Sequence, residues 1–180
     1  MFKKSLIALS LATLATGSFA QMYIQGSVGK GSVNFDCGAG VACTKSNSGN
    51  KFLLGYDAGN GLSYEGQIIN YGKITSTAFQ DVKATGYGAN VAYSGNFSDQ
   101  FGYRVAGGLA RNKIDTPSVA AATATSSWQL AVGGGVAYNF NKSVAATLDY
   151  DLSNGKFAQT ATTTGTGSVS LISFGIRARF

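Results

Sequence analysis

Residues 128–152, WQLAVGGGVAYNFNKSVAATLDYDL, decide the fold class of this chain. Large apolar side chains and glycine occupy every second position on one face of this stretch: Trp128, Leu130, Val132, Gly134, Val136, Tyr138 and Phe140. Small or polar residues fill the positions between them, and a period of two is typical of a β-strand with unlike faces. Asn141-Lys142 interrupts the pattern, which then resumes from Val144. The stretch therefore predicts a β-hairpin with one apolar face.

The same period recurs along the chain. It predicts eight strands, over residues 22–28, 52–58, 62–68, 87–93, 101–109, 128–140, 144–152 and 172–180. Short connections at 59–61, 96–100 and 141–143 alternate with long ones at 31–49, 75–83, 114–126 and 155–167. An even strand count with alternating short and long connections is typical of single-chain outer-membrane barrels, in which the short turns face the periplasm. Both termini are then expected in the periplasm.

The polarity of the two faces indicates what surrounds the barrel. The aromatic residues lie on the apolar face, whereas the opposite face carries charges at Glu65, Arg104, Asp149, Asp151 and Arg177. A soluble barrel of lipocalin type would show the reverse arrangement, with a polar outside and an apolar pocket. Aromatic residues also gather near both ends of the predicted strands, as interfacial girdles do. We therefore expect lipid outside and a filled, polar interior.

The hairpins predict specific cross-strand pairs on the apolar face. Simple registers place Leu54 opposite Gly66, Tyr87 opposite Gly107, and Tyr150 opposite Gly134. Large side chains beside glycine would cover exposed backbone in each hairpin. These glycines are interpreted as packing features of the sheet, as is the mid-strand run 133–135, which precedes no helix and forms no phosphate loop.

The first twenty residues are typical of a secretory signal peptide. Lys3 and Lys4 precede an apolar run over 5–16 that is too short to span a bilayer, and Ser18 and Ala20 provide small residues for cleavage after Ala20. The domain organisation expected is a signal peptide over 1–20 and one barrel domain over 21–180. No later segment reaches the length of a transmembrane helix.

The chain has two cysteines, Cys37 and Cys43, in the sequence CGAGVAC. An exported protein meets an oxidising periplasm, so we expect a local disulfide within a predicted long loop. Zinc is a poor alternative because the chain has no histidine and two thiolates form an incomplete shell. No metal and no other cofactor is expected.

Three segments carry a family resemblance: LSYEG at 62–66, YRVAGGLA at 103–110, and SLISFGIRARF at 170–180. With the signal peptide, they resemble the small outer-membrane barrel superfamily that includes the OmpA membrane domain, OmpX and the opacity-type proteins. The resemblance covers residues 21–180. It implies an all-β, eight-stranded antiparallel up-and-down transmembrane barrel in the outer membrane of a Gram-negative bacterium, without the periplasmic peptidoglycan-binding domain of full-length OmpA-like proteins.

The resemblance also implies partners. The C-terminal pattern with Phe174, Ile176 and Phe180 resembles the assembly signal read by the barrel insertion machinery, with periplasmic chaperones upstream. Outer-membrane lipid and lipopolysaccharide would surround the barrel. Seven basic residues at or near the predicted loop end are candidates to bind lipopolysaccharide phosphates: Lys30, Lys45, Lys51, Lys73, Lys83, Arg111 and Lys113. Loops on a rigid scaffold often carry binding, so host or surface ligands are further candidates.

Four inward charges are the main candidate site: Glu65, Arg104, Asp149 and Arg177. One interpretation is a salt-bridge network that plugs a narrow lumen, since charges removed from water need partners. The alternative is a gate that rearranges to pass small solutes. An enzyme is disfavoured because known barrel enzymes rely on histidine, and nucleic acid is disfavoured because the basic residues are scattered. The predicted function is a non-enzymatic structural or surface-interaction protein, adhesin-like or opacity-like, with a narrow pore as the alternative.

Overall fold

The computed structural model describes residues 22–34, 43–44, 46–76, 82–115, 125–158 and 164–180. Nine strands are present in these ranges: β1 (Met22–Asn34), β2 (Cys43–Thr44), β3 (Ser46–Gly59), β4 (Leu62–Ser76), β5 (Val82–Asn96), β6 (Phe101–Asp115), β7 (Thr125–Asn139), β8 (Val144–Ala158) and β9 (Thr164–Arg179). Within the described ranges, no helix has the length and apolar character needed to cross a membrane.

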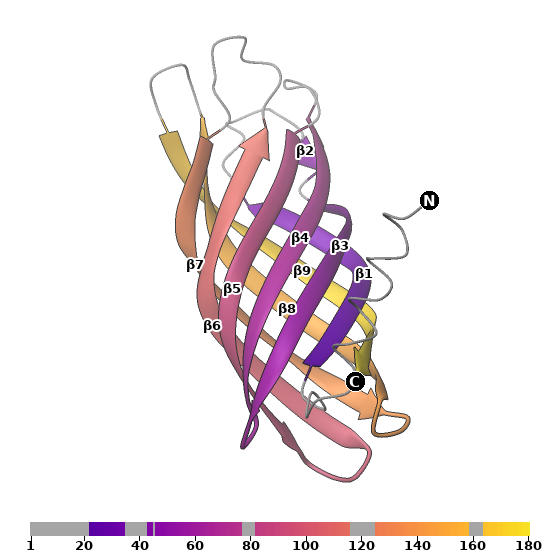
Figure 1. Cartoon of the computed structure of the whole chain (residues 1–180). Helices are drawn as coiled ribbons and strands as arrows, with labels where there is room; N and C mark the ends of the chain where they lie inside the picture. Colours follow the sequence, from indigo (N-terminus) through magenta and orange to yellow (C-terminus); the bar gives the residue numbers. More distant parts are fainter. Residues whose placement is uncertain (1–21, 35–42, 45, 77–81, 116–124, 159–163) are drawn as a thin grey trace, which may run out of the picture.

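Eight of these strands close into an antiparallel barrel (Figure 1). Each strand pairs with its neighbours in the chain, and the ring closes where β1 pairs with β9. The two-residue β2 adds only to the end of β4, where Cys43 pairs with Ser76. A closed ring leaves no unpaired sheet edge, as a lipid-exposed sheet requires. The predicted eight-stranded fold is confirmed.

The strands are longer at one end than the sequence indicated. The connections β3–β4, β5–β6 and β7–β8 lie at the turn end, shown at the bottom of Figure 1. The other connections lie at the loop end, and there pairing continues well into the predicted long loops. For example, β6 runs to Asp115 and β8 runs to Ala158. The predicted bounds of the long connections were therefore too wide, because Gly, Ser and Thr residues near them pair in the sheet.

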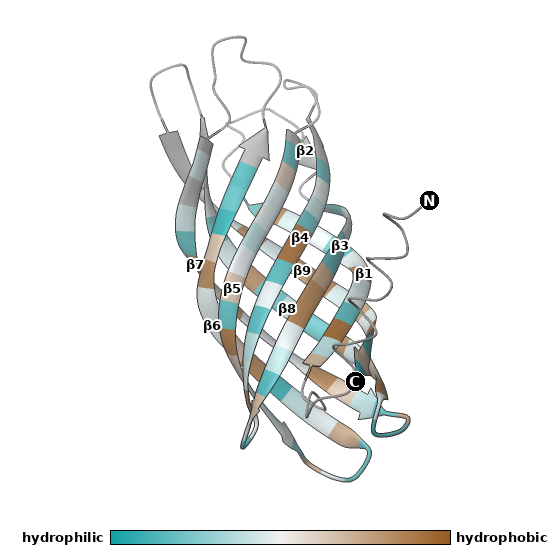
Figure 2. Ribbon diagram, in the orientation of Figure 1, coloured by the Kyte–Doolittle hydropathy of each residue, from teal (hydrophilic) through white to brown (hydrophobic). Residues whose placement is uncertain are grey.

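The two faces of the sheet alternate as predicted (Figure 2). On β3, Phe52 is 52 % exposed whereas its neighbour Leu53 is fully buried. Rings gather near both ends of the outer face: Phe101 and Tyr138 lie 5.2 Å apart at the turn end, and Tyr87 and Trp128 lie 6.2 Å apart toward the loop end. Apolar side chains thus face outward over most of the barrel, and a lipid environment stabilises that arrangement.

Two of the three predicted hairpin pairs are confirmed. Leu54 lies opposite Gly66, and Tyr150 lies opposite Gly134. The third prediction was wrong, because Tyr87 pairs with Arg111. β5 runs further toward the turn than expected, whereas β6 begins at Phe101 as expected, and Asn96 pairs with Gly102. Every partner in the hairpin is therefore moved by four residues.

A bulge in β4 changes which side chains face inward. The pairing with β5 shifts between Asn70 and Gly72, which leaves Tyr71 without a partner in the β4–β5 ladder. Gly72 has a φ of 90°, a left-handed conformation that glycine adopts without steric cost. Tyr71 is buried in regular alternation with Ile69, and the alternation restarts one residue later beyond it, so Lys73 is exposed where an unbulged strand would turn it inward.

Candidate functional site

A pair of oppositely charged side chains from β4 and β6 lies inside the barrel. The guanidinium of Arg104 binds the carboxylate of Glu65 with two hydrogen bonds, one from Nη2 to Oε2 and one from Nε to Oε1 at 2.6 Å. Both side chains are at most 3 % exposed. Tyr23 from β1 donates its hydroxyl to the same Oε1 at 2.6 Å. The predicted meeting of Glu65 and Arg104 is present, and the pair is bidentate, the geometry in which such pairs are strongest.

Asp149 on β8 connects this pair to the opposite wall. Its Oδ1 lies 3.8 Å from Arg104 Nη1, and its Oδ2 accepts a hydrogen bond of 2.6 Å from Gln25 Nε2. Gln25 Oε1 in turn accepts two hydrogen bonds from Arg177, at 3.0 and 2.9 Å. Arg177 also lies over the ring of Tyr23, 5.0 Å from its centroid. The four predicted charges are thus joined, but Arg177 is joined through Gln25 and Tyr23, which the sequence analysis did not select.

A second ion pair lies toward the loop end. Lys51 Nζ lies 2.6 Å from Asp151 Oδ2 and 3.5 Å from Asp149 Oδ2, and the Lys51 side chain is fully buried. The prediction that Lys51 binds lipopolysaccharide phosphates outside the barrel was wrong. Its position was assigned from nearness to a loop, although it shares the inward alternation of Leu53 and Gly55.

Glycines in β7 make room for the two aspartates. A Cβ atom on Gly133 would lie 2.7 Å from Asp151 Oδ1, and one on Gly135 would lie 2.6 Å from the backbone oxygen of Leu148. Any larger residue here would displace the carboxylates. Gly133 and Gly135 therefore serve lumen packing, whereas Gly134 lies on the outer face opposite Tyr150.

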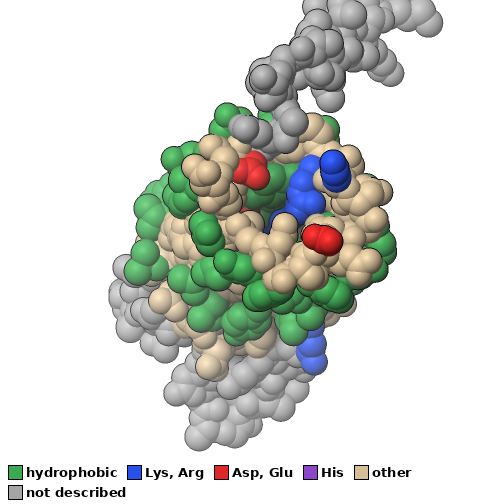
Figure 3. Space-filling view, turned by 90° about the horizontal axis from the view of Figure 1, so that it is seen from below, with side chains coloured by type: hydrophobic (Ala, Val, Ile, Leu, Met, Phe, Trp, Pro, Cys, Tyr) green, Lys and Arg blue, Asp and Glu red, His purple; other side chains and the backbone are tan. Residues whose placement is uncertain are grey.

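Together these residues form what we call the ionic layer: Tyr23, Gln25, Lys51, Glu65, Arg104, Asp149, Asp151 and Arg177. Its members come from β1, β3, β4, β6, β8 and β9, so their contacts cross the lumen. Viewed from the turn end, basic side chains lie within the opening of the barrel (Figure 3). The charges are paired and buried, which is how charges persist away from water.

A different filling occupies the lumen nearer the loop end. Six buried residues, each at most 2 % exposed, form what we call the apolar layer: Val33, Ile69, Tyr71, Ala84, Val169 and Leu171. It adjoins the ionic layer directly, because Ile69 pairs with Lys51 and Leu171 pairs with Asp151 across neighbouring strands. Small and polar residues are predicted throughout the interior from the sequence, so the apolar layer is a finding of the structure.

A known protein family has the architecture described above. The family model for the outer membrane protein beta-barrel domain matches residues 5–180. The chain belongs to this family. No curated protein sequence matches the chain.

Solved structures similar to this barrel share its fold at low sequence identity. Neisserial surface protein A has a TM-score of 0.63 and 17% identity, covering 88% of this chain and 97% of that one. Ail, the attachment invasion locus protein of Yersinia pestis, has a TM-score of 0.62 and 15% identity, covering 89% and 98%. OprG from Pseudomonas aeruginosa has a TM-score of 0.54 and 14% identity, covering 89% and 96%. At these identities the likeness shows the fold alone.

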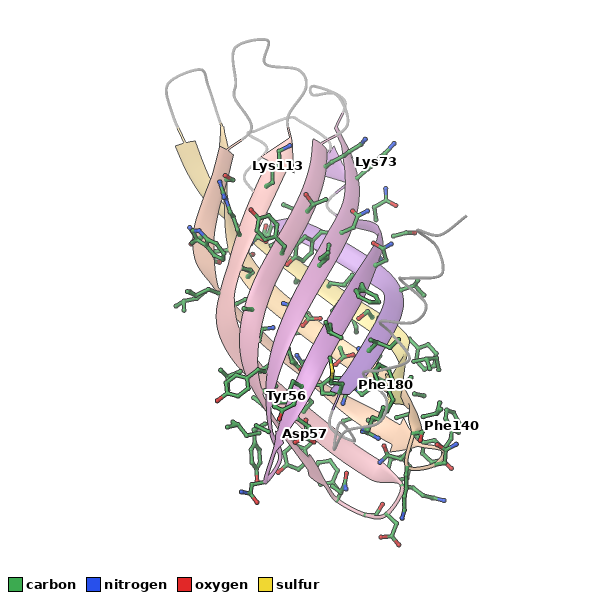
Figure 4. All side chains as sticks on the ribbon, in the orientation of Figure 1. Tyr56, Asp57, Lys73, Lys113, Phe140 and Phe180 are labelled. Atoms are coloured by element: carbon green, nitrogen blue, oxygen red, sulfur yellow. The ribbon has the colours of Figure 1, made fainter. Side chains whose placement is uncertain are left out.

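Membership of the outer-membrane barrel family sets the orientation of the site. In such barrels the short turns face the periplasm, so the ionic layer lies in the periplasmic half of the lumen. Phe174, Ile176 and Phe180 are exposed on the outer face near the turn end, and their role as an assembly signal stays a prediction. Figure 4 shows Phe180 and Phe140 at this end of the barrel.

Other predicted features lie outside the described residues. The signal peptide and its cleavage after Ala20 fall there, as does Cys37. The disulfide between Cys37 and Cys43 therefore stays a prediction. Among the residues that the structure describes, no group of three or more acidic, cysteine or histidine side chains could hold a metal ion.

Proposed function

We propose that this outer-membrane barrel is a non-enzymatic protein with a closed lumen, acting as an envelope scaffold and presenting its loop end to surface ligands, in an adhesin-like or opacity-like role. The observation that carries the closed lumen is its filling by two adjoining layers, the ionic layer and the apolar layer. In the ionic layer, the Lys51 and Glu65 side chains are completely buried, and hydrogen bonds join both walls. Breaking such a pair exposes an uncompensated charge, which makes spontaneous opening costly.

Planar-bilayer recording tests the closed lumen. The full chain, purified and refolded, is expected to give no stable conductance steps under conditions in which a general porin gives regular ones. Frequent, uniform openings of the wild-type protein would contradict the proposal and support the narrow pore instead.

The narrow-pore alternative has one observation in its favour. Five lumen atoms in the periplasmic half are buried and have no hydrogen-bond partner among the described residues: Gln67 Oε1, Asn90 Oδ1, Arg104 Nη1, Thr147 Oγ1 and Ser173 Oγ. Water satisfies such groups when space allows. Water in the periplasmic half agrees with a narrow pore. It also agrees with a closed lumen, because water in that half opens no path through the loop-side half.

The surface role is proposed to depend on the segments that connect the strands at the loop end. A deletion strain complemented with the wild-type chain should adhere to host cells or matrix better than the deletion strain alone. Replacing residues 116–124 with a glycine-serine segment of equal length should remove the gain, if that segment carries the contact. Equal adhesion with and without the protein would contradict the surface role and leave the scaffold role to be judged by detergent sensitivity.

We further propose that basic residues on the outer face bind lipopolysaccharide phosphates. Lys73 and Lys83 are exposed and lie directly opposite each other on β4 and β5, and Arg111 and Lys113 follow on β6. Figure 4 shows Lys73 and Lys113 at the loop end. Clustered basic side chains at a membrane surface attract the phosphate groups of lipids. Lys30 is exposed on β1, apart from this group, and Lys45 lies outside the described residues.

Co-purification of lipopolysaccharide tests this partner. The double variant Lys73→Gln and Lys83→Gln should retain less lipopolysaccharide than the wild type through a mild-detergent purification. Lys142→Gln is the matched control, since Lys142 is equally exposed but lies at the turn end. Unchanged retention in the double variant would rule out this group as the binding surface.

A further inference from the structure

The apolar layer has a property that the ionic layer lacks: it contains no charged side chain. Its six members are packed together at 0 to 2 % exposure. On the opposite wall at this height, Asn112 on β6 donates to Ser153 Oγ at 2.9 Å and to the backbone oxygen of Asn154 at 2.6 Å. This link joins β6 to β8 and completes the cross-section with neutral groups. Asn112 Oδ1 is the one buried side-chain oxygen here that lacks a partner among the described residues.

Tyr71 continues the inward alternation of Gln67 and Ile69, and the β4 bulge that follows it turns Lys73 to the outer face. The backbone of Tyr71 approaches β1 so closely that a Cβ atom on Gly31 would collide with it. Its ring extends the other way, to 3.3 Å from the position that a Cβ atom on Gly86 of β5 would occupy. The side chain therefore fills space between β1 and β5, and glycine at both contact points permits that fit.

The two layers oppose ion passage by different means. Charged side chains can exchange partners, and water can replace a lost bond, so a polar network can rearrange. A packed apolar layer offers an ion nothing to replace its hydration, and moving a charge into such a region costs far more than a hydrogen bond supplies. Apolar constrictions close channels in this way by excluding water.

We propose that the apolar layer is the permeability barrier of this barrel, with Tyr71 and Leu171 as its sealing residues. The ionic layer forms the end wall of a compartment open to the periplasm, and breaking that wall leaves the lumen closed. The inference rests on the closed lumen of the proposed function.

Conductance of three variants tests the barrier. Glu65→Gln and Arg104→Gln together with Lys51→Gln and Asp151→Asn break both ion pairs of the ionic layer, and this variant should be as silent as the wild type. Adding Tyr71→Ser and Leu171→Ser to that variant should produce channel openings. The matched control adds Tyr150→Ser and Ile172→Ser instead, a tyrosine and an aliphatic residue exposed on the lipid face of β8 and β9, and should stay silent.

Each result decides between the two layers. Openings in the variant with only the ionic layer broken would overturn the apolar barrier, as would a combined variant that stays silent although it folds. Folding is checked by heat-dependent gel mobility and circular dichroism. If the combined variant does not fold, Leu171→Ser alone in the broken ionic layer is the test, with Ile172→Ser as its control. Openings in the wild type would overturn the proposed function itself, which separates the two failures.

Discussion

The periplasmic half and the loop-side half of the lumen are enclosed by the same strands but filled by opposite chemistry. In the periplasmic half, Glu65 and Arg104 are held by short, directional bonds to a few partners. In the loop-side half, Leu171 and Val169 are held by contact with neighbouring hydrocarbon. The difference teaches that a narrow barrel is closed by filling its interior with side chains. The chemistry of those side chains decides which substitutions destabilise the barrel. A bonded network is sensitive to the loss of one member, and an apolar layer is sensitive to the loss of volume.

The largest effect is expected from Glu65→Ala. This change leaves the buried Arg104 without its bidentate partner and Tyr23 without its acceptor. Removing one member of a buried ion pair typically costs about 3–5 kcal/mol. Urea unfolding of the refolded barrel in lipid vesicles measures the loss, and Glu65→Gln, which keeps an acceptor oxygen, should lose less. A loss no greater than that of the glutamine variant would show that the pair does not hold this half together.

A somewhat smaller loss is expected from Leu171→Ala in the other half. Leu171 is fully buried, and truncating a buried leucine costs about 2–5 kcal/mol, depending on how far the cavity collapses. Ile172→Ala is the control, because Ile172 faces outward on the same strand. Equal losses for the two variants, again by urea unfolding, would mean that the apolar layer contributes no more than the lipid face.

Gly72→Ala should destabilise less again, by about 1–3 kcal/mol, the usual cost of forcing a residue with a side chain into a strained backbone region. The φ of 90° at this position belongs to the bulge that turns Lys73 to the outer face. Gly66→Ala is a matched control on the same strand, since an added Cβ atom there meets nothing within 4 Å. If both glycine variants unfold at the same urea concentration, the left-handed backbone at Gly72 does not require glycine.

The smallest effect is expected when the ionic pair is made apolar. Glu65→Leu with Arg104→Met gives the periplasmic half the chemistry of the loop-side half at similar volume. Replacing a buried ion pair in this way is often neutral, or stabilising by about 1–4 kcal/mol. Unfolding at or above the wild-type urea midpoint is expected, in contrast to Glu65→Ala. A large loss would show that the charges specify this fold rather than merely fill it.

Much of this contrast could be predicted from the sequence where alternation is regular. A period of two assigns Glu65, Arg104 and Asp149 to the inside, and the structure places all three there. The same rule places Lys51 inside, because it shares the alternation of Leu53. The prediction that Lys51 binds lipopolysaccharide used only its nearness to a predicted loop. Tyr23 and Gln25 also alternate inward, but a search for charged side chains does not find them because both are neutral.

The apolar layer could not be predicted by alternation alone. Near the loop end, Val169 and Leu171 alternate with small or apolar outward residues, so the pattern there does not separate the faces. The bulge at Asn70–Gly72 then reverses the alternation for Lys73. Gly72 is a residue type that can mark a bulge, but glycine also occurs at regular positions of these strands, such as Gly66, so it does not locate the shift by itself. The predicted register of the β5–β6 hairpin was wrong because it assumed a turn over residues 96–100. In the folded sheet Asn96 itself pairs with Gly102, which the sequence pattern does not indicate.

The seam, where β1 pairs with β9, determines when the barrel can close during folding. Tyr23, close to the start of the described chain, pairs with Arg179, one residue from its end. The hydrogen bonds of β1 with β3 can form early, but those with β9 can form only when the last strand has been made. Until then both seam strands present open edges that invite pairing with other chains. The risk of association with other chains therefore lasts until the ring is closed.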